Sequence, residues 1–221
     1  MHRVLEPELM LDDEQARAYA EADFESAHSQ YLKLFAELFP NRPVQALVLD
    51  LGCGPCDVTI RFARANPGYT FHAVDGSAAM LKYAREQIAR DGDLARRIEL
   101  VEGYIPGAPL SEKIYDVILS SSLLHHLPDP FALWTAVRQR SKHGTLVFVV
   151  DLFRPASRTE AEALTETYAA HEPAVLKRDF FNSLLAAFTP DEVQQQLAEA
   201  GLPTLRVSPI SDRHVMVCGA V

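Results

Sequence analysis

The chain has 221 residues, of which 48% are apolar and 23% charged, and this composition excludes collagen-like, low-complexity and wholly disordered proteins. Thirty acidic against 21 basic residues give a formal net charge of -9, which disfavours nucleic acid and favours a small molecule as the partner. No stretch approaches about 18 uninterrupted apolar residues, and the three cysteines are an odd number. We therefore expect a cytoplasmic protein with no membrane partner and no disulfide framework.

The first expected element is one long amphipathic helix. Between Ala16 and Leu38 apolar residues recur every three or four positions, which is the spacing of a single buried helical face. Pro40 ends this pattern. The next run, residues 44–51, is almost continuously apolar and is typical of a strand buried on both faces of a parallel sheet.

After that strand, helical and extended patterns alternate along the chain. Helices are predicted at 57–65, 77–90 and 130–142, strands at 69–74, 98–101, 115–120 and 145–151, and a loop at 91–93. Repeated βα units of this kind predict a doubly wound, mostly parallel sheet with helices on both faces.

The last third of the chain departs from this alternation. Residues 152–188 carry two helical patterns, at 159–168 and 178–188, and are predicted to be a helical insertion that forms a cap or lid. Thr189 and Glu192 fit a capping box at the start of the following helix. Two short strands, 204–207 and 214–220, are close enough only for an antiparallel pair.

These patterns predict one α/β domain over residues 1–221, with a mixed seven-stranded sheet whose last strand is antiparallel. Its parts are an N-terminal helical segment (1–43), a cofactor-binding core (44–151), the helical insertion (152–188), and a final helix with a terminal hairpin (189–221).

A glycine-containing turn joins the first strand to its helix. Gly52 and Gly54 would let the backbone approach a ligand at the carboxyl edge of the sheet, where open α/β sheets bind ligands. Asp75 follows the second strand, 23 residues after Gly52, and is placed to accept hydrogen bonds from two ribose hydroxyls. The combination predicts a nucleoside-containing cofactor.

Two other interpretations use the same turn. Asp57 stands where dinucleotide-binding proteins have a third glycine, and its charge would face a diphosphate, which disfavours NAD and FAD. Residues Cys53 to Cys56 spell the CGPC tetrapeptide of thioredoxin-like oxidoreductases. No Trp precedes Cys53, however, and five βα units exceed a thioredoxin fold. A thiol–disulfide oxidoreductase and a nucleoside-binding module without catalytic activity stay open as alternatives.

Three segments, Val48 to Gly54, Ala73 to Leu81 and Tyr115 to Pro130, resemble the class I S-adenosylmethionine-dependent methyltransferases. The resemblance implies a Rossmann-like fold, S-adenosylmethionine as cofactor, S-adenosylhomocysteine as product, and transfer of the methyl group to a small-molecule acceptor at O, N or S. The donor carries no phosphate, so an acidic Asp57 beside the turn is tolerated.

The resemblance also implies which residues hold the cofactor. Those matching Asp50, Gly52 and Gly54 would surround the methionine and ribose portions, Asp75 would hold the ribose hydroxyls, and Met80 would pack near the adenine. The complete predicted set is Asp50, Gly52, Cys53, Gly54, Asp75, Gly76, Ser77, Met80, Gly103, Tyr104, Ile105 and Ser120.

Catalysis of methyl transfer needs alignment of the reactants, exclusion of water and, for weak nucleophiles, a base. His125 and His126 follow the fourth strand, where the acceptor should enter, and they are predicted as catalytic because histidine can deprotonate a hydroxyl or thiol near neutral pH. A structural or capping role for this pair stays open. The two histidines and Asp129 lack the one-face spacing of a zinc site, so no metal is predicted.

Overall fold

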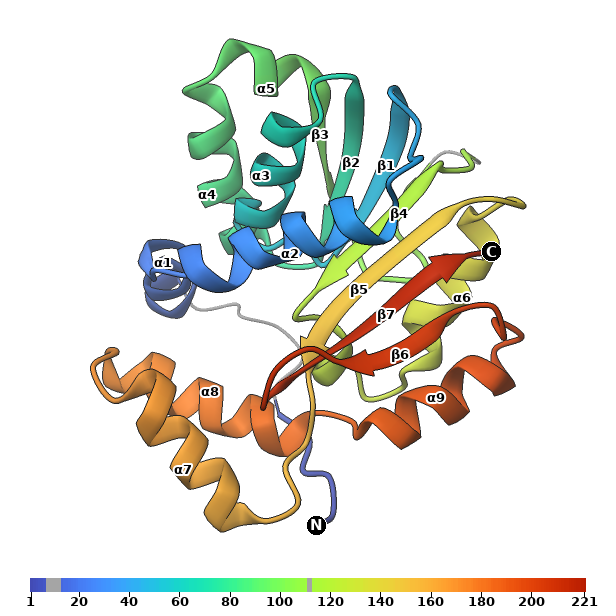
Figure 1. The fold of residues 1–221 in the computed structure, drawn as a ribbon. Coiled ribbons are helices and arrows are strands. Elements are labelled where there is room, and N and C mark those ends of the chain that lie inside the picture. Colours follow the sequence, from blue (N-terminus) through green and yellow to red (C-terminus); the bar gives the residue numbers. More distant parts are fainter. Residues whose placement is uncertain (7–12, 111–112) are drawn as a thin grey trace.

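A seven-stranded mixed sheet forms the centre of the protein, as seen in a computed structural model that describes residues 1–6, 13–110 and 113–221 (Figure 1). The strand order is β3-β2-β1-β4-β5-β7-β6. The strands are β1 (Ala46–Leu51), β2 (Tyr69–Asp75), β3 (Ile98–Glu102), β4 (Val117–Ser121), β5 (Leu146–Leu152), β6 (Arg206–Pro209) and β7 (His214–Ala220). Neighbours from β3 to β5 are parallel, whereas β7 is antiparallel to both β5 and β6. The predicted sheet and its antiparallel last strand are confirmed.

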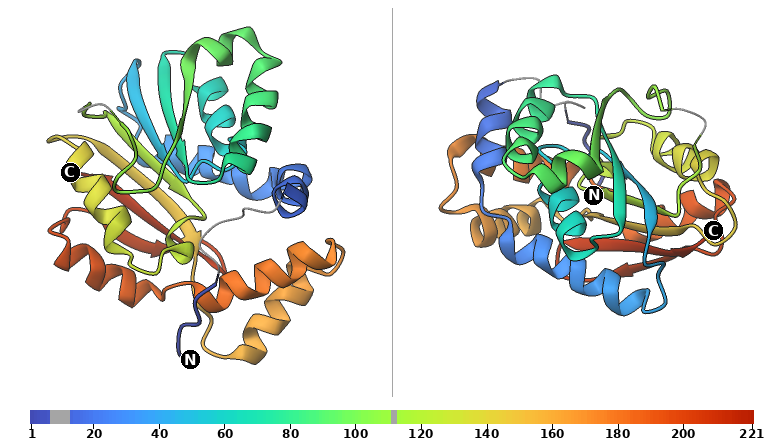
Figure 2. Two further views of the ribbon diagram at one scale, coloured as in Figure 1. Left: turned by 180° about the vertical axis from the view of Figure 1, so that it is seen from behind. Right: turned by 90° about the horizontal axis from the view of Figure 1, so that it is seen from above.

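Helices cover both faces of this sheet (Figure 2). They are α1 (Asp13–Glu21), α2 (Glu25–Leu38), α3 (Asp57–Ala65), α4 (Ala78–Ala89), α5 (Gly92–Arg97), the 3-10 turn η1 (Leu124–His126), α6 (Phe131–Arg140), α7 (Arg158–Ala169), α8 (Ala174–Ala186) and α9 (Pro190–Glu199). Among the described residues, none of the helices is both long and apolar enough to cross a membrane.

Each central strand contributes to two separate hydrophobic cores. In β1, Val48 packs into the core that holds the buried residues of α2, α3 and α4, while Leu49 packs into the core that holds those of α6 and α9. Successive strand side chains point to opposite faces, so a strand between two helical layers must be apolar at every position. This explains the continuous apolar run that marks β1 in the sequence.

The expected long N-terminal helix is in fact two helices, and this prediction was wrong. The chain breaks between α1 and α2, where the Asp23 carboxylate accepts a hydrogen bond of 2.9 Å from the Glu25 backbone N–H. A side chain that accepts from the backbone two residues ahead competes with helix continuation. The break lets α1 turn away from α2 and approach α4 and α8.

The predicted loop at 91–93 was also partly wrong, because Gly92 and Asp93 begin the short helix α5. Asp91 caps this helix, since its Oδ1 accepts hydrogen bonds from the backbone N–H groups of Asp93 at 3.0 Å and Leu94 at 3.4 Å. Aspartate is a favoured N-cap residue because it satisfies these free donors.

The insertion is a helical hairpin of α7 and α8 below the carboxyl edge of the sheet (Figure 1). It has a small core of its own, made of Leu152, Ala161, Leu164, Leu184, Leu185 and Ala187. Helix α8 begins at Ala174, four residues before the predicted start at 178. The capping box at the start of α9 is confirmed: the Thr189 hydroxyl accepts from the Glu192 N–H at 3.2 Å, and Glu192 accepts from the Thr189 N–H at 2.8 Å.

Candidate cofactor and acceptor site

A cavity of about 710 Å³ opens at the carboxyl edge of the sheet. The β1–α3 turn and the residues that follow β2, β3 and β4 form one side of it, and α1, α2, α7 and α8 contribute the other. Ligands of open α/β sheets bind at this edge, outside the carboxyl ends of the strands. The cavity therefore lies where the sequence predicts a cofactor.

The glycine turn at the start of α3 has a left-handed backbone. Gly52 has φ +74° and Gly54 has φ +53°. A Cβ atom on Gly52 would lie 2.8 Å from Leu123 Cδ1, whereas a Cβ on Gly54 would meet nothing within 4 Å. Gly52 is thus required by packing against the β4–η1 segment, while Gly54 leaves a space in the cavity wall that a ligand can fill.

Asp75, at the end of β2, is locked in position by two backbone donors. Its Oδ2 accepts from the Gly54 N–H and its Oδ1 from the Ser77 N–H, each at 2.8 Å. Burial raises the pKa of Asp75, although these two donors act in the opposite direction. Each carboxylate oxygen can accept more than one hydrogen bond. Asp75 can therefore hold the glycine turn and still accept two hydroxyls from a ligand in the cavity.

The predicted adenine end lies beside Asp75. Ser77 caps α4 by accepting a hydrogen bond of 3.2 Å from the Met80 N–H, which directs this turn toward the cavity. Tyr104 is 57% exposed and lies at the cavity rim. The predicted cofactor residues that line the cavity are Gly52, Cys53, Gly54, Asp75, Gly76, Ser77, Met80, Gly103, Tyr104 and Ile105.

Asp50 and Ser120 belong to the predicted set but do not line the cavity. The Asp50 carboxylate accepts a hydrogen bond of 2.5 Å from the Thr59 hydroxyl, and burial raises its pKa to about 6. The Ser120 hydroxyl donates to the Leu51 carbonyl at 2.8 Å. Both side chains therefore tie the end of β1 to its neighbours, and direct contact with a cofactor stays a prediction.

The cysteines of the turn lack the features of a dithiol exchange centre. Cys53 and Cys56 are both buried and free. Burial raises the pKa of Cys53 well above its ordinary value, and the neighbouring Cys56 adds to this shift. Exchange requires an accessible thiolate. The geometry gives no support to the oxidoreductase alternative.

At the opposite end of the cavity, His125 is held by a carboxylate from β5. Its Nδ1 lies 2.5 Å from Asp151 Oδ1, and Asp151 Oδ2 accepts from the Leu124 N–H at 2.7 Å. Burial lowers the pKa of His125, but the carboxylates of Asp151 and Glu6 outweigh burial, so the pKa lies above its ordinary value. His126 follows in the same turn, and both histidines line the cavity.

Sequence reasoning missed two contributors to this end, Glu6 and Asp151. Glu6 Oε1 lies 3.6 Å from His125 Nε2 and 3.2 Å from His126 Nδ1. The approach of Glu6 depends on Arg3, which donates to the carbonyls of His125 at 2.9 Å and Leu127 at 2.8 Å. Asp151 could have been found, because it ends a predicted strand next to the strand of the histidines. Nothing in the sequence pairs Glu6 with residues so distant along the chain.

The insertion contributes the outer wall. Tyr168 of α7 and Leu176, Phe180 and Ser183 of α8 line the cavity on the side of the histidines. The insertion therefore forms part of the cavity wall, while its role as a lid over a bound acceptor stays a prediction.

Comparison with known proteins supports the resemblance to methyltransferases that the sequence shows. A family model described as a methyltransferase domain matches residues 49–147. The 27-O-demethylrifamycin SV methyltransferase of Amycolatopsis mediterranei is 27% identical over 193 residues, covering 82% of this chain and 62% of that protein. This chain thus spans less than two thirds of that relative's length.

Two solved structures share the fold. One is a SAM-dependent methyltransferase from Aquifex aeolicus, with a TM-score of 0.67, 17% identity, and coverage of 94% of this chain and 97% of that one. The other is the plantazolicin methyltransferase BpumL in complex with a pentazolic desmethylPZN analog and SAH, with a TM-score of 0.69, 16% identity, and coverage of 95% and 90%. Together with the strand order, these matches confirm the resemblance noted in the sequence. Residues 49–147 therefore match a methyltransferase domain, and the chain has the fold of the S-adenosylmethionine-dependent methyltransferases.

Proposed function

We propose that this protein transfers a methyl group from S-adenosylmethionine to a small-molecule acceptor. The observation that carries the proposal is the cavity wall where the Asp75 carboxylate lies beside the open backbone at Gly54. A nucleoside needs a fixed acceptor for its ribose hydroxyls and close backbone approach, and this wall offers both. The named relative acts on a small molecule, 27-O-demethylrifamycin SV, which supports an acceptor of that class.

The cavity has two ends that match the two reactants. The donor end is formed by the glycine turn, Asp75 and the start of α4, and the acceptor end by η1 with α7 and α8. During transfer the acceptor atom bonds to the methyl carbon while the carbon–sulfur bond breaks and its electron pair returns to sulfur. The protein must align these atoms and exclude water. We propose that His125 and His126 act on the acceptor's nucleophilic atom, because they line the cavity at that end.

The test is transfer itself. The full chain is incubated with methyl-labelled S-adenosylmethionine and fractionated small-molecule extracts, and labelled products are identified by mass spectrometry. We expect label in a small molecule with equimolar S-adenosylhomocysteine, and far less label with the Asp75→Asn variant at the same donor concentration. Binding of S-adenosylhomocysteine without any labelled product in any fraction would instead identify a nucleoside-binding module without catalytic activity.

A substitution in the insertion tests the acceptor end separately. Phe180 lines the cavity from α8, whereas the next residue, Phe181, does not and packs under Arg158. Phe180→Ala should raise the KM for the acceptor about tenfold, because an aromatic contact is worth roughly 1 to 2 kcal/mol. Its affinity for S-adenosylhomocysteine should stay the same.

Phe181→Ala is the matched control on the same helix. Its acceptor KM should equal that of the parent protein. Equal rises in KM for both variants would show that α8 acts only through folding of the insertion.

A further inference from the structure

We propose that Glu6, His125 and His126 form a binding site for one divalent transition-metal ion of the zinc type. Their ligating atoms, Glu6 Oε1, His125 Nε2 and His126 Nδ1, lie within 4.8 Å of one another. Two imidazole nitrogens and one carboxylate oxygen are a ligand set that zinc uses in catalytic sites. The spacing in the sequence concealed this set, because the third ligand comes from the N-terminal segment and not from Asp129.

The two printed distances from Glu6 to the histidines are close to those of a tetrahedral metal site. Zinc bonds to nitrogen and oxygen are about 2.1 Å long, so two ligating atoms in a tetrahedral site lie about 3.4 Å apart. The observed separations from Glu6 Oε1 are 3.6 Å to His125 Nε2 and 3.2 Å to His126 Nδ1. The two imidazole nitrogens lie within 4.8 Å of each other, so the histidine side chains need to close on the ion while Glu6 Oε1 is already at a suitable distance from both.

Asp151 supports the site from behind. The His125 Nδ1 lies 2.5 Å from Asp151 Oδ1, which leaves Nε2 on the side of Glu6, 3.6 Å from its Oε1. Histidines that bind metals commonly donate their other ring N–H to a carboxylate, which fixes the tautomer and the ring orientation. Asp151 is in turn fixed by the Leu124 N–H.

Glu6 provides an independent indication. Its side chain is only 7% exposed, and Oε1 has no hydrogen-bond partner among the described residues, whereas Oε2 accepts from the Ser183 hydroxyl at 3.2 Å. A buried carboxylate oxygen without a donor is costly unless a cation compensates it. An ion with two positive charges at this position would lie between Glu6 Oε1 and the two imidazole rings.

The position of this site gives the ion a role at the acceptor end. Both histidines line the cavity, and three protein ligands leave a coordination position for an oxygen or nitrogen of the acceptor. An ion there would orient that atom and lower its pKa. Because His125 Nε2 would bind the ion, His125 would act as a metal ligand and would not accept a proton from the methyl acceptor. Metal binding is measured without an acceptor, so it can fail independently of methyl transfer.

The experiment measures zinc binding to the full chain after removal of any affinity tag. The protein is stripped with a chelator, dialysed against buffered zinc, and assayed by mass spectrometry for bound metal and by chelator competition for affinity. We expect one zinc ion per chain. Glu6→Gln and His126→Gln should each weaken binding at least tenfold.

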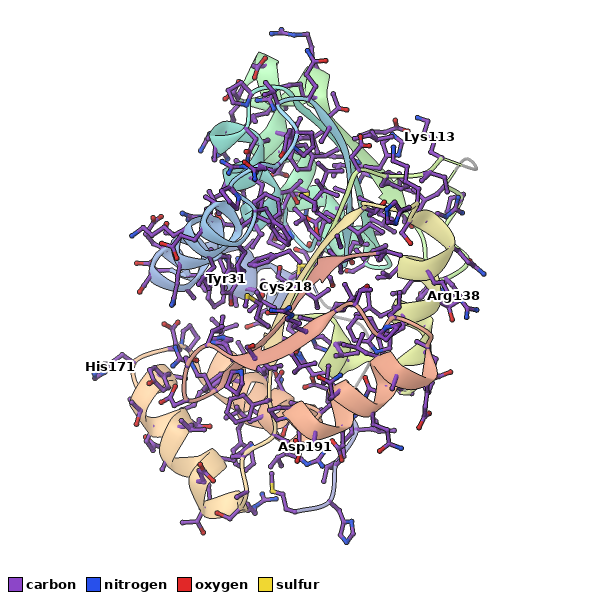
Figure 3. The ribbon with its side chains drawn as sticks, turned by 45° about the vertical axis from the view of Figure 1, so that its right-hand side comes forward. Tyr31, Lys113, Arg138, His171, Asp191 and Cys218 are labelled. Atoms are coloured by element: carbon purple, nitrogen blue, oxygen red, sulfur yellow. The ribbon has the colours of Figure 1, made fainter. Side chains whose placement is uncertain are left out.

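The matched control is His171→Ala, since His171 is an exposed histidine on the loop between α7 and α8 (Figure 3). This variant should bind zinc as the parent does. Titration with S-adenosylhomocysteine shows whether each variant is folded, because the donor end lies outside the cluster. The proposal is overturned by a parent protein that retains no zinc, or by a folded Glu6→Gln variant that binds zinc as tightly as the parent.

Discussion

Replacing Asp75 with Asn will weaken binding of S-adenosylhomocysteine about a hundredfold. Hydrogen bonds to a charged group contribute about 1.5 to 3 kcal/mol each, and the Asp75 carboxylate is placed to receive two from ribose. In the parent protein each carboxylate oxygen of Asp75 accepts from one backbone N–H, that of Gly54 or that of Ser77. Asn replaces one of these oxygens by an NH₂ group, which would face one of the two N–H donors instead of accepting from it. Isothermal titration calorimetry measures the loss.

Glu102→Gln is the control for this prediction. Glu102 ends β3 directly beside Asp75 in the sheet, but its side chain is exposed and does not line the cavity. Its affinity for S-adenosylhomocysteine should match that of the parent. A folded Asp75→Asn variant with unchanged affinity would show that the ribose is held elsewhere.

Replacing Gly52 with Ala will destabilise the fold by about 3 kcal/mol. A left-handed backbone costs an L-residue about 1 to 2 kcal/mol, and overpacking adds about 1 to 3 kcal/mol. The new Cβ would lie within 3 Å of three atoms of the Leu123 side chain at the start of η1. Urea denaturation gives the free energy of unfolding, and the m-value should not change.

Gly54→Ala separates packing from ligand access. Gly54, like Gly52, has a positive φ, but there is open space where a Cβ on Gly54 would lie. The free energy of unfolding of the Gly54→Ala variant should therefore fall by only about 1 kcal/mol. Its affinity for S-adenosylhomocysteine should nevertheless drop strongly, because the Cβ fills the space left for the ligand. If Gly54→Ala bound the ligand normally, the cofactor would not approach this turn.

Local signals explain why so much of the donor end could be predicted. The apolar run of β1, the glycines after it and the acid at the end of β2 are short-range features, and parallel strand order brings them to one edge. The two-sided burial of β1 makes its pattern continuous, so it cannot be confused with an amphipathic helix.

The N-terminal helices show a limit of periodicity. Apolar spacing continues across Asp23 because α1 and α2 each bury one face, so the pattern carried no sign of the break. The signal was instead a polar residue that hydrogen-bonds to the backbone just ahead of it, which helix periodicity does not report.

The acceptor end shows a second limit. Glu6 reaches the histidines only because Arg3 binds carbonyls of η1 and Val4 donates to the Leu185 carbonyl on α8. These contacts join residues from opposite ends of the chain, and they have neither a motif nor a period. Only the folded structure brings the carboxylate to the two imidazoles.

The central claim is that the cavity edge at Gly54 and Asp75 accepts a sulfonium nucleoside and not a dinucleotide. Calorimetric titration of the parent protein with S-adenosylhomocysteine and, separately, with NADH tests it most directly. The account predicts saturable binding of one S-adenosylhomocysteine per chain and no heat from NADH. Absence of S-adenosylhomocysteine binding by the folded protein, or its displacement by NADH, would contradict it.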